Sequence, residues 1–154
     1  MSTHEGFHPE LRAKPASLRT RLHHVRAGDL DANTAQSDGM TRLAAVSGNR
    51  VGSEAIWMGE THVAPATASG NHHHGESETA IYVVSGRPEF VFHDGAEEVR
   101  IATGPGDYIF VPPYVPHREE NPDPANPAVV VIARSTQEAI VVNLPELYPL
   151  PNPE

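Results

Sequence analysis

Residues 72–78 read His-His-His-Gly-Glu-Ser-Glu, and Pro116-His117 follows about forty residues later in a segment framed by glycine and proline. On an extended chain His72 and His74 leave the backbone on the same face, because successive side chains alternate. Glu78 follows after a short loop that contains glycine, and a neighbouring strand can bring His117 back to the same place. Three neutral imidazoles and one carboxylate suit a divalent first-row transition metal, with one or two positions left for water or substrate. His72, His74, Glu78 and His117 are therefore the predicted metal ligands.

The other residues of this stretch have different predicted roles. His73 points to the opposite face from its two neighbours and is expected to lie outside the ligand set. Glu76 competes with Glu78 for the place of the carboxylate, and the alternative for Glu78 is a solvated turn residue. Tyr82 has the same strand parity as Glu78, so its ring is expected to face the cavity. Tyr82 is the candidate catalytic residue, with simple packing as the alternative.

Short apolar runs recur at regular intervals on both sides of this stretch. The candidate strands are residues 22–26, 42–46, 55–63, 80–84, 89–93, 99–101, 108–111, 129–133 and 139–142. Turn residues separate the runs, and Asp94-Gly95 in particular is a strong hairpin signal. Many short strands joined by tight turns are typical of an all-β sandwich or barrel.

The pattern predicts one domain in three parts. Residues 1–40 form an N-terminal arm that is partly irregular, and residues 41–144 form the β-barrel. Residues 145–154 form a proline-rich C-terminal tail. The chain of 154 residues is long enough to bury a core of its own.

Composition excludes several classes of function. Asp and Glu outnumber Lys and Arg by 20 to 11, a formal net charge of −9, which disfavours binding to nucleic acid or to anionic membranes. The absence of cysteine excludes a zinc finger, an iron–sulfur cluster and a cysteine nucleophile. No apolar run approaches membrane-spanning length, and no apolar segment of signal-peptide type opens the chain. We therefore expect a soluble, cytoplasmic protein whose partner is a small-molecule substrate.

Two motifs in the right order resemble those of the cupin superfamily, and the resemblance covers about residues 55–134. The first cupin motif is matched by Gly70, the histidines 72–74, Glu78 and Gly86. Its upstream glycine lies closer to the histidines than the family pattern asks, and seven residues instead of six separate Glu78 from Gly86. The second motif is matched by Gly106, Pro112, His117 and Asn121, with Tyr114 in place of a glycine. The wider sequence is similar to that of small bacterial single-domain cupins.

This resemblance implies an RmlC-like double-stranded β-helix, or jelly roll, with a metal inside the barrel near one open end. It also implies a homodimer, and a divalent transition metal (Fe, Mn, Ni or Zn) as cofactor. Three functions are compatible with it. They are a metal-dependent oxygenase of dioxygenase type, a non-redox isomerase, lyase or decarboxylase, and a non-catalytic module that binds a small ligand or a metal. We favour catalysis, since a purely structural metal site is closed by four ligands and usually rich in cysteine. Among the enzymes we favour the oxygenase, because redox-active metals compete well for imidazole sites.

Three further residues have weaker predicted roles. His62 is expected to be a buried, hydrogen-bonded structural histidine. Trp57, the only tryptophan, is expected in the core. Arg134 ends an apolar run and is expected in a salt bridge at the rim, with bidentate binding of a substrate carboxylate as the alternative.

Overall fold

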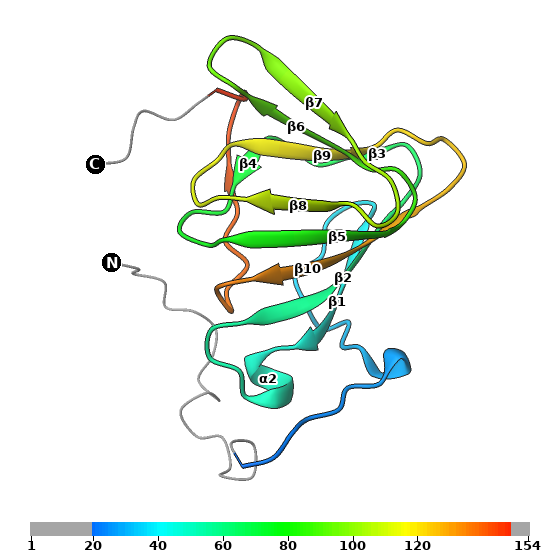
Figure 1. Cartoon of the computed structure of the whole chain (residues 1–154), viewed down its shortest axis with the longest axis vertical. Coiled ribbons are helices and arrows are strands. Elements are labelled where there is room, and N and C mark those ends of the chain that lie inside the picture. Colours follow the sequence, from blue (N-terminus) through cyan, green and yellow to red (C-terminus); the bar gives the residue numbers. More distant parts are fainter. Residues whose placement is uncertain (1–19, 149–154) are drawn as a thin grey trace.

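The computed structural model describes residues 20–148 (Figure 1). Residues 1–19 of the predicted arm and residues 149–154 of the predicted tail lie outside the described part. The described chain is folded into two antiparallel sheets, and its helical content is limited to the short turns η2 (Ala27–Asp29) and α2 (Gly48–Val51). The all-β prediction is confirmed. None of the helices described is long and apolar enough to cross a membrane.

The first sheet has five strands in the order β1-β2-β10-β5-β8. Their bounds are β1 (Met40–Val46), β2 (Trp57–Val63), β10 (Ala128–Arg134), β5 (Thr79–Ser85) and β8 (Tyr108–Val111). The second sheet has the order β11-β4-β9-β6-β7, with β3 paired to β9. Its bounds are β11 (Val142–Asn143), β4 (His72–His73), β9 (His117–Asn121), β6 (Glu89–His93), β7 (Glu98–Ala102) and β3 (Thr67–Ala68).

The chain passes repeatedly from one sheet to the other, which is the connectivity of a jelly roll. After the β1–β2 hairpin it visits the second sheet with β3 and β4, the first with β5, and the second again with β6 and β7. Strands β8, β9, β10 and β11 then alternate between the two sheets. As a result, segments far apart in the sequence, such as β4 and β9, lie side by side (Figure 1).

The core lies between the sheets, and buried residues alternate with more exposed ones most regularly along β2 and β5. On β5, Thr79, Ile81 and Val83 are buried, whereas the residues between them are exposed. The two buried aliphatic residues pack with Phe90, Val111 and Val130. Cross-strand pairing places Trp57, Arg134 and Thr79 side by side on the inward face of the first sheet. This row forms one wall of the cavity described below.

Sequence and structure differ mainly in short elements. Residues 22–26, expected as a strand, form none, and most of their side chains are exposed. Strands β3 and β4 were not expected, because each has only two residues and no periodicity can be read from so short a run. Strand β4 nevertheless carries the first histidine of the site.

Candidate metal centre

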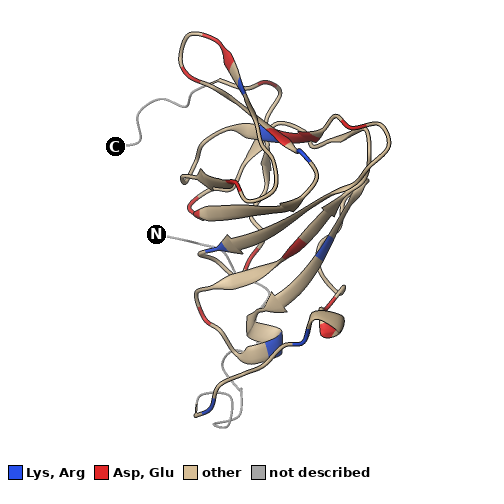
Figure 2. Cartoon of the chain, turned by 45° about the vertical axis from the view of Figure 1, so that its right-hand side comes forward, with Lys and Arg blue, Asp and Glu red and all other residues tan. Residues whose placement is uncertain are grey.

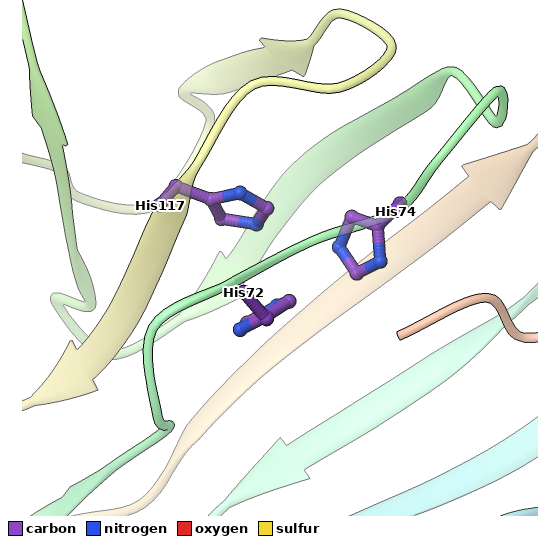
Figure 3. A group of neighbouring side chains, drawn as sticks. All are labelled: His72, His74 and His117. Atoms are coloured by element: carbon purple, nitrogen blue, oxygen red, sulfur yellow. The ribbon is translucent and has the colours of Figure 1, made fainter. Parts of the chain in front are cut away.

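Three histidines from two neighbouring segments converge inside the molecule. His72 lies on β4, His74 on the loop that follows it, and His117 at the start of β9. His72 and His117 are direct partners in the antiparallel β4–β9 pair. One ring nitrogen of each histidine lies within 4.8 Å of those of the other two. Figure 3 shows the three rings facing one another.

Each of these rings is held by a hydrogen bond from its Nδ1 atom to a backbone carbonyl. The pairs are His72 with Gly70 at 2.7 Å, His74 with Ile140 at 2.9 Å, and His117 with Val115 at 3.0 Å. A carbonyl oxygen only accepts, so Nδ1 must carry the proton in all three rings. The lone pair therefore sits on Nε2, the second ring nitrogen, which is the arrangement that metal-binding histidines adopt.

Burial keeps the three rings neutral. Desolvation lowers the pKa of His72, and it lowers the pKa of His74 to about 4 and that of His117 to about 3. The neighbouring rings lower the pKa of His117 further, because two positive charges so close together repel each other. At neutral pH the site consequently presents three uncharged imidazoles ready to bind a cation.

This donor set fits a divalent first-row transition metal. Neutral imidazole suits Fe, Ni and Zn, and Mn is compatible with it, whereas Ca and Mg prefer oxygen ligands. Three protein ligands leave coordination positions open. The rings line a cavity of about 410 Å³ between the two sheets. A small molecule would thus find room next to a metal held by His72, His74 and His117.

The structure does not bring the predicted ligand Glu78 or the predicted catalytic Tyr82 to this site. Glu78 is exposed, and its backbone N–H donates to Ser135 Oγ at 2.9 Å. Tyr82 is 38% exposed, and its ring lies 4.9 Å from that of Tyr108 on the outer face of the first sheet. Glu78 and Tyr82 lie on the same side of the chain, as predicted. That side is the exposed one, however, and not the one that faces the cavity. The buried residues on either side of Glu78, Ser77 and Thr79, line the cavity instead.

Three other residues of the histidine-rich region also lie outside the cluster. His73 faces away, and its ring lies 5.7 Å from Tyr114 while its Nδ1 accepts from Gly75 N–H at 2.9 Å. Glu76 is not part of the ligand cluster. His62 is not buried as expected: its side chain is 42% exposed and pairs with Glu60 at 3.0 Å.

Tyr114, which stands where the cupin motif has a glycine, takes the left-handed conformation that glycine adopts without strain. Its φ is +64°, and its backbone N–H donates to the carbonyl of Gly75 at 2.8 Å. This bond joins the turn before β9 to the loop after His74. The backbone of the motif is therefore preserved although the residue is not.

Two charged residues that the sequence reading missed also line the cavity. Arg42 lies on the inward side of β1 between Met40 and Ala44, and Glu119 follows His117 by two residues on β9. Burial raises the pKa of Glu119, and its Oε2 atom has no hydrogen-bond partner among the described residues. Strand parity with His117 was the available signal for Glu119.

Arg134 lies inside the cavity and forms no rim salt bridge with a described residue, contrary to expectation. Its guanidinium carbon lies 4.0 Å from the centre of the Trp57 ring. Burial, with the nearby charge of Arg42, lowers the pKa of Arg134 to about 10. Trp57 is buried as predicted.

Comparison with known proteins agrees with this architecture. The Cupin domain family matches residues 59–134. The polyketide cyclase RemF from Streptomyces resistomycificus has a similar structure, with a TM-score of 0.66 and 23% identity over 80% of this chain and 86% of the cyclase. An uncharacterized conserved protein with a double-stranded beta-helix domain from Klebsiella pneumoniae has a TM-score of 0.58 and 16% identity, over 75% of this chain and 92% of that one.

An oxalate decarboxylase of Bacillus subtilis is similar over 71% of this chain but only 29% of its own length, with a TM-score of 0.60 and 22% identity. At such identities the likeness establishes the fold alone. No curated protein matches the sequence. The family match and the double-stranded β-helix together show that the chain belongs to the cupin superfamily.

Proposed function

We propose that this cupin is a small-molecule metalloenzyme in which His72, His74 and His117 hold one divalent first-row transition metal ion. The observation that carries the proposal is the set of three Nδ1–carbonyl hydrogen bonds, which leave the lone pair on each Nε2, in a cluster whose possible ligand atoms lie within 4.8 Å of one another. A bound metal would supply a Lewis-acidic charge and, if it is Fe, Mn or Ni, access to redox chemistry. The walls of the cavity would position the substrate and shield it from water.

The finer proposal is an oxygenase of dioxygenase type. Its support is that imidazole ligands accept redox-active metals and that only three protein ligands occupy the metal, which leaves room for substrate and O2. The walls offer apolar surface from Met40, Ile81 and Ile132 to an organic substrate.

A non-redox lyase, isomerase or decarboxylase is the second candidate, and the composition of the ligand set favours it. Because Glu78 lies outside the histidine cluster, the three clustered donors are all neutral and would leave the charge of a divalent ion uncompensated. Such an ion polarises an anionic substrate strongly. The name of one structural neighbour, a polyketide cyclase, also belongs to a reaction other than oxygenation.

The first experiment is metal analysis of protein purified without a histidine tag. We expect about one transition metal ion per chain in the wild type and none in a His74→Ala, His117→Ala double variant, since a lost ligand is rarely compensated. Glu78→Gln is the matched control and should keep its metal, because Glu78 lies outside the cavity. Full occupancy in the double variant would disprove the ligand assignment.

Oxygen uptake then decides between the two classes of enzyme. Fe(II)-loaded protein is screened with small carbonyl, carboxylic and phenolic compounds in an oxygen electrode. Substrate-dependent uptake that disappears in the double variant supports the oxygenase. Product formation without uptake of oxygen supports the non-redox class. Neither activity, with retained metal, points to the binding module.

A further inference from the structure

We propose that the cavity beside the three histidines binds a small carboxylic acid, and that Arg134 and Arg42 recognise its carboxylate. The inference names the substrate class for the proposed function. It rests on that function for which end of the ligand reacts, namely the end next to the metal. The arginines themselves are observed independently of any metal.

Arg134 is held in a fixed orientation by neutral groups. Trp57 covers one face of its guanidinium at 4.0 Å, Nε donates to the carbonyl of Thr136 at 3.0 Å, and Nη2 donates to that of Gln137 at 2.9 Å. Its Nη1 group makes no hydrogen bond to a described residue. A planar guanidinium fixed in this way is pre-organised to bind a carboxylate through its free edge.

Arg42 is the second positive charge on the same cavity. Its Nη1 donates to Ser37 Oγ at 3.0 Å, and its Nη2 lies 3.9 Å from the sulfur of Met40. Arg42 lines the same cavity as Arg134 and the three histidines. Two arginines thus act on one pocket next to the histidines.

Two arginines outside the cavity are paired with carboxylates. Arg100 pairs with Glu89 at 2.9 Å and with Glu120, and Arg118 also pairs with Glu120, at 2.7 Å. Within residues 20–148, neither Arg42 nor Arg134 has a carboxylate oxygen within 4.0 Å. A partly buried guanidinium without a counter-ion is costly, so an anionic ligand would stabilise the site.

Two acidic residues, Asp38 and Glu119, line the same cavity. Neither takes part in the ion pairs of the described residues, which involve other arginines. The other acidic residues of this chain, whose net charge is −9, are spread over both sheets and several loops (Figure 2). The two guanidinium groups therefore remain available to an anionic ligand.

Two buried polar atoms without a partner among the described residues indicate a further polar group on the ligand. Thr61 Oγ1 and Glu119 Oε2 have no hydrogen-bond partner among the described residues, and both residues line the cavity. Buried polar atoms are normally paired, so a hydroxyl group on the ligand would satisfy one of them. With the apolar surface of Ile81 and Ile132, these atoms describe a hydroxy acid with an apolar body.

The test uses the single tryptophan as its reporter, because Trp57 stacks on Arg134. Full-length protein, apo and Zn-loaded, is titrated with α-hydroxyisocaproate and with its uncharged analogue α-hydroxyisocaproamide, and Trp57 fluorescence is followed. We expect saturable binding of the acid and binding of the amide at least about tenfold weaker, since a charge-assisted hydrogen bond is lost.

Variants assign the effect to the arginines. Arg134→Gln should weaken binding of the acid about tenfold or more and leave the amide unchanged, and Arg134→Lys should fall between. Arg50→Gln, on α2 and away from the cavity, is the matched control and should bind like the wild type. If Arg134→Gln does not melt cooperatively, Arg42→Gln takes its place in the same titration.

The outcomes separate this inference from the proposed function. Equal affinity for acid and amide in metal-loaded protein overturns the inference and leaves the metal site intact. Displacement of the acid by inorganic phosphate at equal affinity overturns the assignment to a carboxylate. Arg134-dependent binding of the acid in a protein that takes up no metal when Zn(II) is supplied supports the inference and contradicts the proposed function.

Discussion

At the scale of single residues, the buried histidines make the stability of the metal-free protein depend on pH. The pKa of His74 is lowered to about 4 and that of His117 to about 3 in the folded state, whereas an unfolded histidine titrates near 6.5. Below pH 6.5 the unfolded chain therefore binds more protons than the folded one. For each histidine the free energy of unfolding falls by about 1.4 kcal/mol per pH unit.

Glu119 opposes this effect without reversing it. Its raised folded pKa gives stability that is present at low pH and lost as pH rises above the carboxyl range. Between pH 7.5 and 5.5 each of these two histidines contributes about 1.4 kcal/mol, because its unfolded form titrates in the middle of this range. Glu119 offsets part of that sum, so we expect a net loss of about 1–2 kcal/mol. Urea denaturation of the apo protein at the two pH values measures it, and the His74→Asn, His117→Asn double variant should show a smaller difference. Equal stability of the wild type at both values would contradict the buried, neutral state of the rings.

Metal binding should follow the same protonation. Because protons and metal compete for Nε2, saturating Zn(II) is expected to raise the melting temperature at pH 7.5 and to lose that effect as the pH falls below the range where the three rings stay neutral. Differential scanning calorimetry with and without Zn(II) measures the shift. A shift of the same size in the His74→Asn, His117→Asn double variant would mean that the metal binds elsewhere.

At the scale of the strand, Gly59 of β2 is the residue with the least room for change. A Cβ atom there would lie 2.2 Å from the carbonyl oxygen of Leu43 and 2.7 Å from the ring of Trp57. Gly59→Ala must therefore move β1 or the tryptophan, and we expect it to lower the free energy of unfolding by about 1–3 kcal/mol. Urea denaturation tests this, with Gly28→Ala as control because a Cβ at Gly28 meets nothing within 4 Å. Unchanged stability in Gly59→Ala would show that the β1–β2 pair is looser than described.

Strand β5 shows where sequence reading succeeds and where it fails. The existence of the strand could be predicted from its apolar run, and the convergence of His72, His74 and His117 from parity and motif spacing. Which face of β5 points inward could not be predicted, because both faces carry large hydrophobic side chains, Tyr82 and Val84 on one and Ile81 and Val83 on the other. The left-handed Gly75, with φ at +56°, also breaks the parity between His74 and the residues that follow. Alternation identifies the two faces of a strand only when their polarity differs.

At the scale of the whole molecule, the outer face of β5 and β8 carries an exposed apolar patch. It consists of Tyr82, Val84, Tyr108 and Phe110, of which Tyr108 is 76% and Phe110 57% exposed. Such a patch usually marks an interface. The homodimer stays a prediction, and this patch is where we expect the second copy.

Light scattering after size-exclusion chromatography tests the dimer. We expect twice the chain mass for the wild type and the single-chain mass for a Tyr108→Glu, Phe110→Glu double variant, because two charges would have to be buried. Ile56→Glu is the control, since Ile56 is also exposed but lies outside the patch. A wild type that elutes as a monomer at all concentrations would refute the prediction.

The carbonyl of Ile140 lies beyond the segment that matches the Cupin domain family, which ends at residue 134, yet it orients His74. Strand β11 pairs with β4 in the same region. A chain truncated after Arg134 keeps all three imidazoles, but we expect its Zn(II) affinity to fall 10- to 100-fold, the usual cost of losing a partner of a ligand. Competition with a chelating dye measures it. The family relationship is thus visible in residues 59–134, whereas the orientation of a metal ligand depends on a segment that lies outside that match.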